Sequence, residues 1–174
     1  MNGKTENVYG IPYKEGEVII YTDGGARGNG ASDAVCGYGF CMTYGADYYM
    51  EGHGATIGST NNKMELYAII AALSAVEQTN AKVTVYTDSN LIYQGWNNWL
   101  PGWIAKGWRT TTGPVKNVEL WKMLRMVARD FKDLRICKCK GHAGDPGNER
   151  ADALVNEAMD LCVATGRPTM HFAY

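Results

Sequence analysis

Long apolar runs are absent from this 174-residue sequence: none approaches the roughly 20 residues that a membrane-spanning helix needs. The first residues, MNGKTENVYGIPYKEGE, also lack the apolar core of a signal peptide. These two absences predict a cytoplasmic protein with no membrane partner.

Paired cysteines are missing as well. The five cysteines are an odd number and include no CxxC pair, which argues against a disulfide framework and against a zinc finger. Cys137 and Cys139 fall on one face of a predicted strand. That spacing is compatible with a metal site, but buried reduced thiols are the more common arrangement.

An overall basic charge is the third absence. The chain has 17 Lys and Arg against 18 Asp and Glu, a net charge of −1 and a pI near 6.3. This balance counts modestly against a nucleic-acid-binding role, and any basic patch must be local. With 45% hydrophobic residues, the length suits one domain with a hydrophobic core.

The pattern along the chain predicts three parts. Residues 1–16 show no periodicity and form a short N-terminal extension, residues 17–163 form the domain, and residues 164–174 form a C-terminal tail. No repeat, linker or low-complexity tract divides the domain. We therefore expect a monomer without an obligate protein partner.

Periodicity predicts the secondary structure of the domain. Strands are expected at 17–23, 35–44 and 46–55, as an antiparallel meander. Helical spacing of apolar residues follows over 59–78, with Thr60 or Asn61 as the N-cap, and then a strand over 81–88. A helix between two such strands favours a parallel βαβ crossover.

Short helices and a projecting loop follow over 89–117, then a helix over 115–131, a strand over 134–140 and a final helix within 141–166. The predicted fold class is therefore α/β, with a mixed five-stranded sheet. It joins three antiparallel strands to parallel ones, with helices on both faces.

Four acidic residues stand at positions that this topology brings together. Asp23 and Asp88 each end a strand that reads Tyr-Thr-Asp, while Glu65 and Asp152 lie near helix starts. Taken singly, each has an ordinary explanation as a turn former, a first-turn helix acid or a solvated acid. Together they would repel one another unless divalent cations bind between them. Oxygen ligands favour Mg²⁺ first and Mn²⁺ second, and two ions would suit phosphodiester chemistry.

The sequence around these acids resembles that of type 1 ribonuclease H. The motifs YTDGGARGNG, STNNKMELYA, VYTDSN, PVKNVELW and KGHAGDPGNERAD occur in the family's order between residues 18 and 162. The resemblance implies a ribonuclease H-like fold and an endonuclease that hydrolyses the RNA strand of an RNA–DNA hybrid. Attack in line, with two bound Mg²⁺ ions, would leave a 5′-phosphate and a 3′-hydroxyl.

The resemblance also assigns catalytic roles. The metal-binding acids are Asp23, Glu65, Asp88 and Asp152, and the loop histidine is His142. Histidine titrates near neutral pH, so His142 is expected to move protons or to help product leave.

Substrate contacts are implied at several polar residues. Gly24, Asn29, Asn61 and Asn62 are expected to read sugars and minor-groove edges, and Thr60 to belong to a phosphate pocket for the DNA strand. Asn90 stands where glutamine is typical of the family. The family's arginine before Thr60 is replaced here by Ile57 and Gly58, which leaves the pocket without that cation.

The tryptophan-rich stretch resembles the family's basic protrusion, which grips the DNA strand. Its cations between Trp96 and Lys122 exceed its acids by three, since Lys106, Arg109, Lys116 and Lys122 oppose Glu119. Trp99 and Trp108 are expected to face DNA, and Trp96, Trp103 and Trp121 to pack inside.

Three alternatives share parts of this pattern. A related nuclease or strand-transfer enzyme of the same fold would keep the acids without the full motifs. A non-catalytic hybrid-binding module would replace at least one acid, and all four are present. An actin-like kinase also begins with a strand into Asp-Gly, but it needs two such domains.

Overall fold

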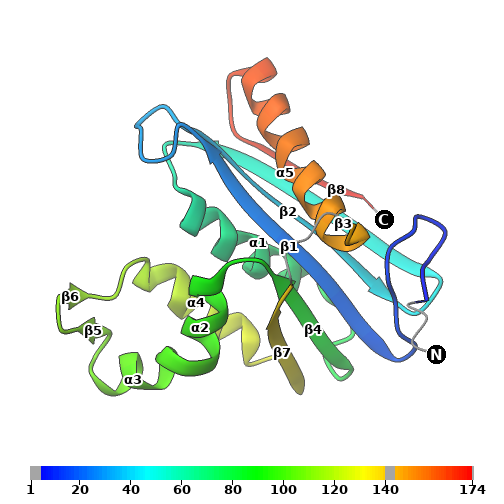
Figure 1. Ribbon diagram of the computed structural model, residues 1–174, viewed down its shortest axis with the longest axis horizontal. Helices are drawn as coiled ribbons and strands as arrows, with labels where there is room; N and C mark the ends of the chain where they lie inside the picture. The colour runs from blue at the N-terminus through cyan, green and yellow to red at the C-terminus, as the bar shows by residue number, and fades with distance from the viewer. Residues whose placement is uncertain (1–4, 140–143, 174) are drawn as a thin grey trace.

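A mixed sheet of six strands organises the structure, a computed structural model that describes residues 5–139 and 144–173 (Figure 1). The strand order is β7-β4-β1-β2-β3-β8. The neighbours β1–β2, β2–β3 and β3–β8 are antiparallel, and β1–β4 and β4–β7 are parallel. These strands are β1 (Glu17–Arg27), β2 (Val35–Tyr44), β3 (Tyr48–Ile57), β4 (Lys82–Thr87), β7 (Asp133–Lys138) and β8 (Thr169–Ala173).

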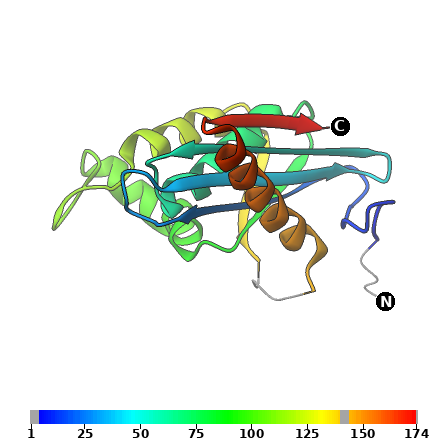
Figure 2. The same cartoon turned by 90° about the horizontal axis from the view of Figure 1, so that it is seen from above.

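Helices cover both faces of the sheet, as predicted. Helix α5 lies across one face, and α1 and α4 lie on the other (Figures 1 and 2). The larger core cluster fills the space between the sheet and α1 and α4, and a smaller one lies under α5. The helices are α1 (Asn61–Ala75), α2 (Asn90–Gln94), the π-helix η1 (Gly95–Trp99), α3 (Leu100–Ala105), α4 (Val118–Ala128) and α5 (Pro146–Thr165).

The predicted fold class is confirmed, but the number of strands is one higher than expected. β8 comes from the segment expected to be a C-terminal tail, and it pairs with the outer edge of β3. Gly166, with φ of 69°, ends α5 in the left-handed conformation and reverses the chain. The strand is only five residues long, and a free edge on β3 is what gives it a partner.

The first strand is also longer than predicted. The sequence GGARGNG was expected to turn directly after Asp23, but β1 continues to Arg27 and pairs with β2 throughout. The turn begins at Gly28, which has φ of 74°. Gly24 and Gly25 are therefore strand residues, and Asp23 lies inside the strand.

Residues 5–16 pack against the end of the sheet. Ile11 is buried beside Ile19 and Cys41, and the Thr43 hydroxyl donates to the Pro12 carbonyl at 2.9 Å. Asn7 accepts from the backbone N–H groups of Tyr9 and Ile11, which shapes the turn before Ile11.

The tryptophan-rich stretch forms a projection at one side of the sheet (Figure 1). It consists of α2, η1, α3 and a small hairpin of β5 (Arg109–Thr110) and β6 (Gly113–Pro114). Among the described residues, no helix combines the length and apolar character that crossing a bilayer requires.

Candidate active site

Three of the four predicted acids meet where β1 and β4 separate. The parallel register pairs Tyr21 with Tyr86, and each strand carries its aspartate two residues later. β4 ends at Thr87, so Asp88 follows the strand directly, while Asp23 stays within β1. Carboxylate oxygens of Asp23, Glu65 and Asp88 lie within 4.8 Å of one another.

Gly24 allows Glu65 to reach this point. A Cβ atom at Gly24 would lie 2.4 Å from the backbone nitrogen of Glu65, inside the backbone of α1. The strand and the helix therefore touch at a residue without a side chain. The Gly24 N–H also donates to the Asp23 carboxylate at 2.9 Å. The sequence placed Gly24 among the substrate-reading residues, and its structural role is this close approach.

Helix α1 begins where the sequence predicted. The Thr60 hydroxyl accepts from the Lys63 N–H at 3.3 Å, and the Asn29 side chain accepts from the Asn61 N–H at 3.0 Å. Two backbone N–H groups at the start of the helix thus have acceptors, and one of these acceptors, Asn29, lies in the β1–β2 turn. This fixes Glu65 in the second turn.

The electrostatics of the cluster disfavour charge on its acids. Burial, with the Asp88 charge next and Asp152 adding to it, raises the pKa of Asp23 to about 7. Burial and the charges of Asp23 and Asp88 raise the pKa of Glu65 to about 9. The Gly24 N–H opposes both shifts only in part.

Asp152 lies beside the cluster rather than within it. It stands in the second turn of α5, exposed to solvent, and its charge contributes to the raised pKa of Asp23. It is outside the three-residue group defined by the 4.8 Å distance. The fourth acid thus comes from the opposite face of the sheet. His142 falls outside the described residues.

The donor set fits hard divalent cations. All ligands are carboxylate oxygens, as Mg²⁺ and Mn²⁺ prefer. Oε2 of Glu65 is buried without a hydrogen-bond partner in the described structure, so a buried acceptor faces the cluster with nothing to satisfy it. The cluster is compatible with metal binding.

The cysteine pair does not extend this picture. No disulfide joins any of the described cysteines, Cys137 and Cys139 among them. Within residues 5–139 and 144–173, the acidic cluster is the one group of three or more His, Cys, Asp or Glu residues whose ligand atoms lie within 4.8 Å of one another.

A hollow of about 440 Å³ lies beside the start of α1. We call it the asparagine–lysine hollow. It brings together the predicted Asn29, Thr60, Asn61, Asn62 and Lys116, and adds two residues that the sequence reasoning missed, Lys63 and Asn117.

Two cations from elsewhere in the fold line the asparagine–lysine hollow. Lys63 and Lys116 give the asparagine–lysine hollow two cations although Ile57 and Gly58 supply none. Asn117 precedes α4 with φ of 59°, a conformation that asparagine tolerates better than most residues. The helix predicted over 115–131 included Asn117, but α4 begins one residue later, at Val118.

The projection carries the remaining predicted DNA contacts. Trp99, Lys106 and Arg109 are exposed, and Lys116 lies where the projection returns to the hollow. Trp121 is buried, while Trp108 is half-buried, with the Lys122 ammonium 5.9 Å from its ring. Trp96 and Trp103 pack against the core as expected, and Trp108, which was expected to face DNA, packs against it too. Asn90 starts α2 and accepts from Lys138 at 3.4 Å.

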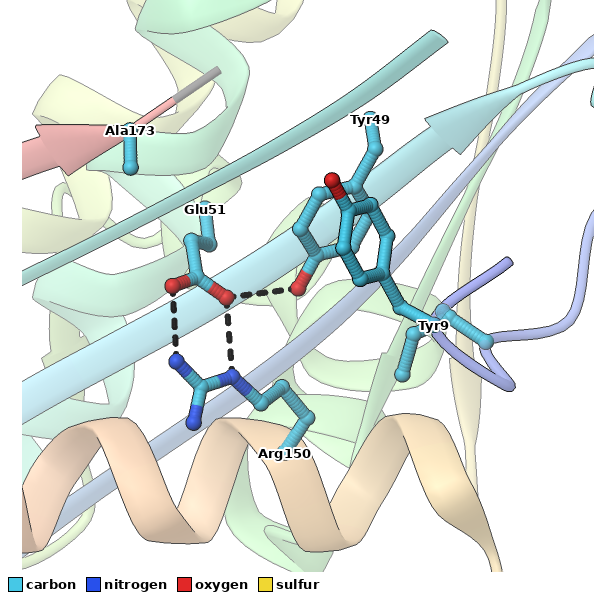
Figure 3. Close-up of a pocket in the computed structure, with 6 residues that line it drawn as sticks. Tyr9, Tyr49, Glu51, Arg150 and Ala173 are labelled. Carbon is cyan, nitrogen blue, oxygen red and sulfur yellow. Dashed lines mark hydrogen bonds and ion pairs between the residues drawn. The ribbon is translucent and has the colours of Figure 1, made fainter. Parts of the chain in front are cut away.

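A second carboxylate site lies on the α5 face, in a cavity of about 300 Å³ that we call the tyrosine–arginine cavity (Figure 3). Arg150 donates to both oxygens of Glu51, at 2.7 and 2.8 Å, and the Tyr49 hydroxyl donates to Glu51 at 2.6 Å. Burial alone would raise the pKa of Glu51, but the hydrogen bonds from Arg150 and Tyr49 outweigh it and hold that pKa below its usual value.

Comparison with known proteins identifies the family. The sequence profile described as RNase H matches residues 15–160. The chain is 49% identical over 146 residues to the ribonuclease H of Paracidovorax citrulli, covering 83% of this chain and 95% of that protein. It is 45% identical over 150 residues to the ribonuclease H of Lachnoclostridium phytofermentans, covering 83% and 92%.

Solved structures agree with this result. LC9-RNase H1, described as a type 1 RNase H with the type 2 active-site motif, has a TM-score of 0.72 and 28% identity, covering 91% of this chain and 76% of that one. RNase H1 of Halobacterium salinarum has a TM-score of 0.60 and 29% identity, covering 83% and 98%. With a matching family profile, curated relatives and the same fold, the chain belongs to the RNase H family of hydrolytic endoribonucleases.

Proposed function

We propose that this protein hydrolyses the RNA strand of RNA–DNA hybrids and leaves 5′-phosphate and 3′-hydroxyl ends. The observation that carries the proposal is the cluster of Asp23, Glu65 and Asp88, three acids whose carboxylate oxygens lie within 4.8 Å of one another. Family membership supplies the substrate class. The same proposal includes a monomer that acts in the cytoplasm without an obligate protein partner.

Asp23, Glu65, Asp88 and Asp152 would hold two Mg²⁺ ions, or Mn²⁺ in their place. Such ions, when bound, convert a water into a nucleophile at neutral pH and stabilise the charge on the leaving 3′ oxygen. The protein contributes the geometry: β1, α1 and β4 converge, and Gly24 lets two of the carboxylates approach. His142 is proposed to shuttle a proton or assist product release.

The binding residues divide the work between the two strands. Backbone groups at Gly24 and the side chains of Asn29, Asn61, Asn62 and Asn90 are proposed to contact sugars and base edges. The asparagine–lysine hollow would hold a phosphate of the DNA strand, with Thr60 and Lys116 donating to it. Trp99, Lys106, Trp108 and Arg109 would grip the DNA strand along the projection.

Cleavage of an end-labelled RNA–DNA hybrid in Mg²⁺ tests the proposal. Single-stranded RNA, double-stranded RNA and duplex DNA serve as parallel substrates, and Asp88→Asn as the inactive variant. We expect cutting of the RNA strand in the hybrid alone, lost in Asp88→Asn. Binding of the hybrid without any cutting in Mg²⁺ or Mn²⁺ would contradict the proposal and favour a non-catalytic binding module.

A further inference from the structure

A second hollow adjoins the proposed phosphate site and has no part in the function described so far. It measures about 340 Å³, and we call it the tyrosine pocket. Its lining includes Tyr38 and Tyr67, the apolar residues Ala55, Ile57 and Met64, and Lys63.

Lys63 lines both hollows, and so connects them. Ser59 borders the tyrosine pocket and Thr60 borders the asparagine–lysine hollow, so the two spaces also meet along the chain. Lys63 and Tyr67 are four residues apart on α1, which places them on the same helix face about 6 Å apart along the axis. A ligand that bound a cation at one end could meet an aromatic ring at the other.

The two tyrosines form a supported aromatic platform. Their ring centroids are 6.0 Å apart with planes 27° apart, a stacked arrangement. Tyr38 sits over Gly54 of β3, where a Cβ atom would lie 2.6 Å from its ring. Tyr38 is thus held by the sheet and Tyr67 rests on Tyr38, yet 41% of Tyr67 remains exposed.

The tyrosine–arginine cavity provides an internal contrast. It also has a tyrosine pair, Tyr9 and Tyr49, with centroids 4.9 Å apart. Its cation, Arg150, is already bound to Glu51 and Glu157. Lys63, by comparison, forms no ion pair among the described residues. Of these two tyrosine-lined cavities, only the tyrosine pocket has a cation that forms no ion pair with an acid among the described residues.

We propose that the tyrosine pocket binds an unpaired nucleotide of the DNA strand, next to the phosphate held in the asparagine–lysine hollow, with its base stacked on Tyr67. Bases inside a duplex are already stacked and paired, so only a nucleotide beyond the hybrid can use the platform. Stacking on an aromatic ring suits any base and needs no sequence preference. The enzyme would therefore favour hybrids whose DNA strand continues as a single strand.

This inference rests on the proposed function, because it takes the phosphate in the asparagine–lysine hollow to be that of the DNA strand. The inference adds that the enzyme binds most tightly at a junction where the RNA strand ends and the DNA strand continues unpaired.

Binding measured by fluorescence anisotropy tests it, with Ca²⁺ in place of Mg²⁺ so that the hybrid stays intact. The probes are a blunt hybrid and hybrids with a few unpaired deoxythymidines added to the 3′ or the 5′ end of the DNA strand. Matched hybrids carry the same extension on the RNA strand. We expect one DNA-strand extension to tighten binding by about fivefold or more.

Variants assign the gain to the platform. Tyr67→Ala should lose the gain and keep its affinity for the blunt hybrid within about twofold, and Tyr67→Phe should keep the gain because a ring remains. Tyr9→Ala, which removes an exposed tyrosine of the other pair, should behave as the unchanged protein. Unchanged melting temperatures verify that each variant is folded.

Three results would overturn the inference: no gain from either DNA-strand extension, an equal gain in Tyr67→Ala, or an equal gain from extending the RNA strand. Each of these leaves cleavage of the blunt hybrid intact. Failure of the unchanged protein to bind or cut the blunt hybrid would instead overturn the proposed function.

Discussion

The two carboxylate sites of this protein lie on the same sheet and differ in what surrounds their charge. Glu51 accepts from Arg150 and Tyr49, and its pKa is held below the usual range. Asp23 and Glu65 have each other, Asp88 and a backbone N–H, and their pKa values rise to about 7 and 9. Both sites hold partly or fully buried acids, but among the described residues only the first pairs its acid with a cation.

This difference indicates which carboxylates stabilise the folded state. A buried acid paired inside the chain favours the folded state at neutral pH, because its ionised form is better stabilised there than in the unfolded chain. A cluster without a cation opposes folding at the same pH. The free energy that the cluster costs is recovered only when something positive binds, which is what a metal-dependent site requires.

The largest effect should come from exchanging acid for amide at the two sites. Glu65→Gln should reduce cleavage by about a thousandfold or more, roughly 4 kcal/mol of barrier, because it removes a proposed metal ligand. Glu51→Gln should leave cleavage within a few fold. Initial rates on the hybrid in Mg²⁺ measure both variants.

The stabilities of these two variants should change in opposite directions. Without metal at pH 7, Glu65→Gln should raise the free energy of unfolding by about 1–2 kcal/mol. Glu65 is ionised in the unfolded chain at this pH and must take up a proton on folding, because its folded-state pKa is raised to about 9, whereas glutamine needs no proton. Glu51→Gln should lower it. Urea unfolding in a chelating buffer measures the change, and loss of stability in both variants would break the comparison.

Removal of the counter-charge itself should have the next largest effect. Arg150→Met leaves Glu51 without its cation. Because the side chains of Arg150 and Glu51 are 32% and 16% exposed, we expect a cost of about 2 kcal/mol, below that of a fully buried pair. The melting temperature should fall by about 5 °C.

Arg27→Met is the matched control for that variant. Arg27 pairs with Asp160 at 2.8 Å, but those side chains are 43% and 70% exposed. An exposed pair contributes little, so the control should change stability by less than about 1 kcal/mol. Equal losses in the two variants would show that burial does not distinguish these pairs.

The pH dependence of stability should separate the two sites without mutation. Because the folded-state pKa values of Asp23 and Glu65 are raised, their contribution to stability is present at acidic pH and is lost as the pH rises toward about 7 and 9. Metal-free protein should therefore melt several degrees lower at pH 9 than at pH 6.

Mg²⁺ should reverse much of that loss, and by more at pH 8 than at pH 6, since it binds the ionised acids. Glu51 acts in the opposite sense: its lowered pKa makes its contribution disappear as the pH falls through the acid range. Differential scanning calorimetry with and without Mg²⁺ tests both statements. A melting temperature that rises with pH in the chelating buffer would contradict the first.

The smallest expected effect is on the salt dependence of hybrid binding. It concerns cations that have no acid partner, just as the acidic cluster consists of acids that have no cation partner among the described residues. Among the described residues, Lys106, Arg109 and Lys116 form no ion pair. If each contacts one phosphate, hybrid affinity should fall with salt at a logarithmic slope of about 3, which is shallow compared with a more basic relative. Lys116→Ala should reduce that slope by about 1. If the salt dependence of hybrid affinity is as steep for this protein as for a more basic relative, the expectation is wrong.

Much of this site could be predicted because its residues sit in motifs with local meaning. The two Tyr-Thr-Asp strands, the N-cap at Thr60 and the helix that carries Glu65 all follow from short stretches of sequence. Long-range packing was harder to predict. The continuation of β1 past Asp23 and the pairing of β8 with β3 depend on partners far along the chain.

By itself, then, the sequence determined the fold class, the family and the set of acids, because strand and helix periods and short motifs are local properties. Only the tertiary structure decided that three acids meet closely while Asp152 stands aside, and that Lys63 and Lys116 line one hollow. It also decided that Gly24 serves as the contact between strand and helix. The physical reason is that charge pairing and close approach are set by distances through space, which spacing along a chain does not specify.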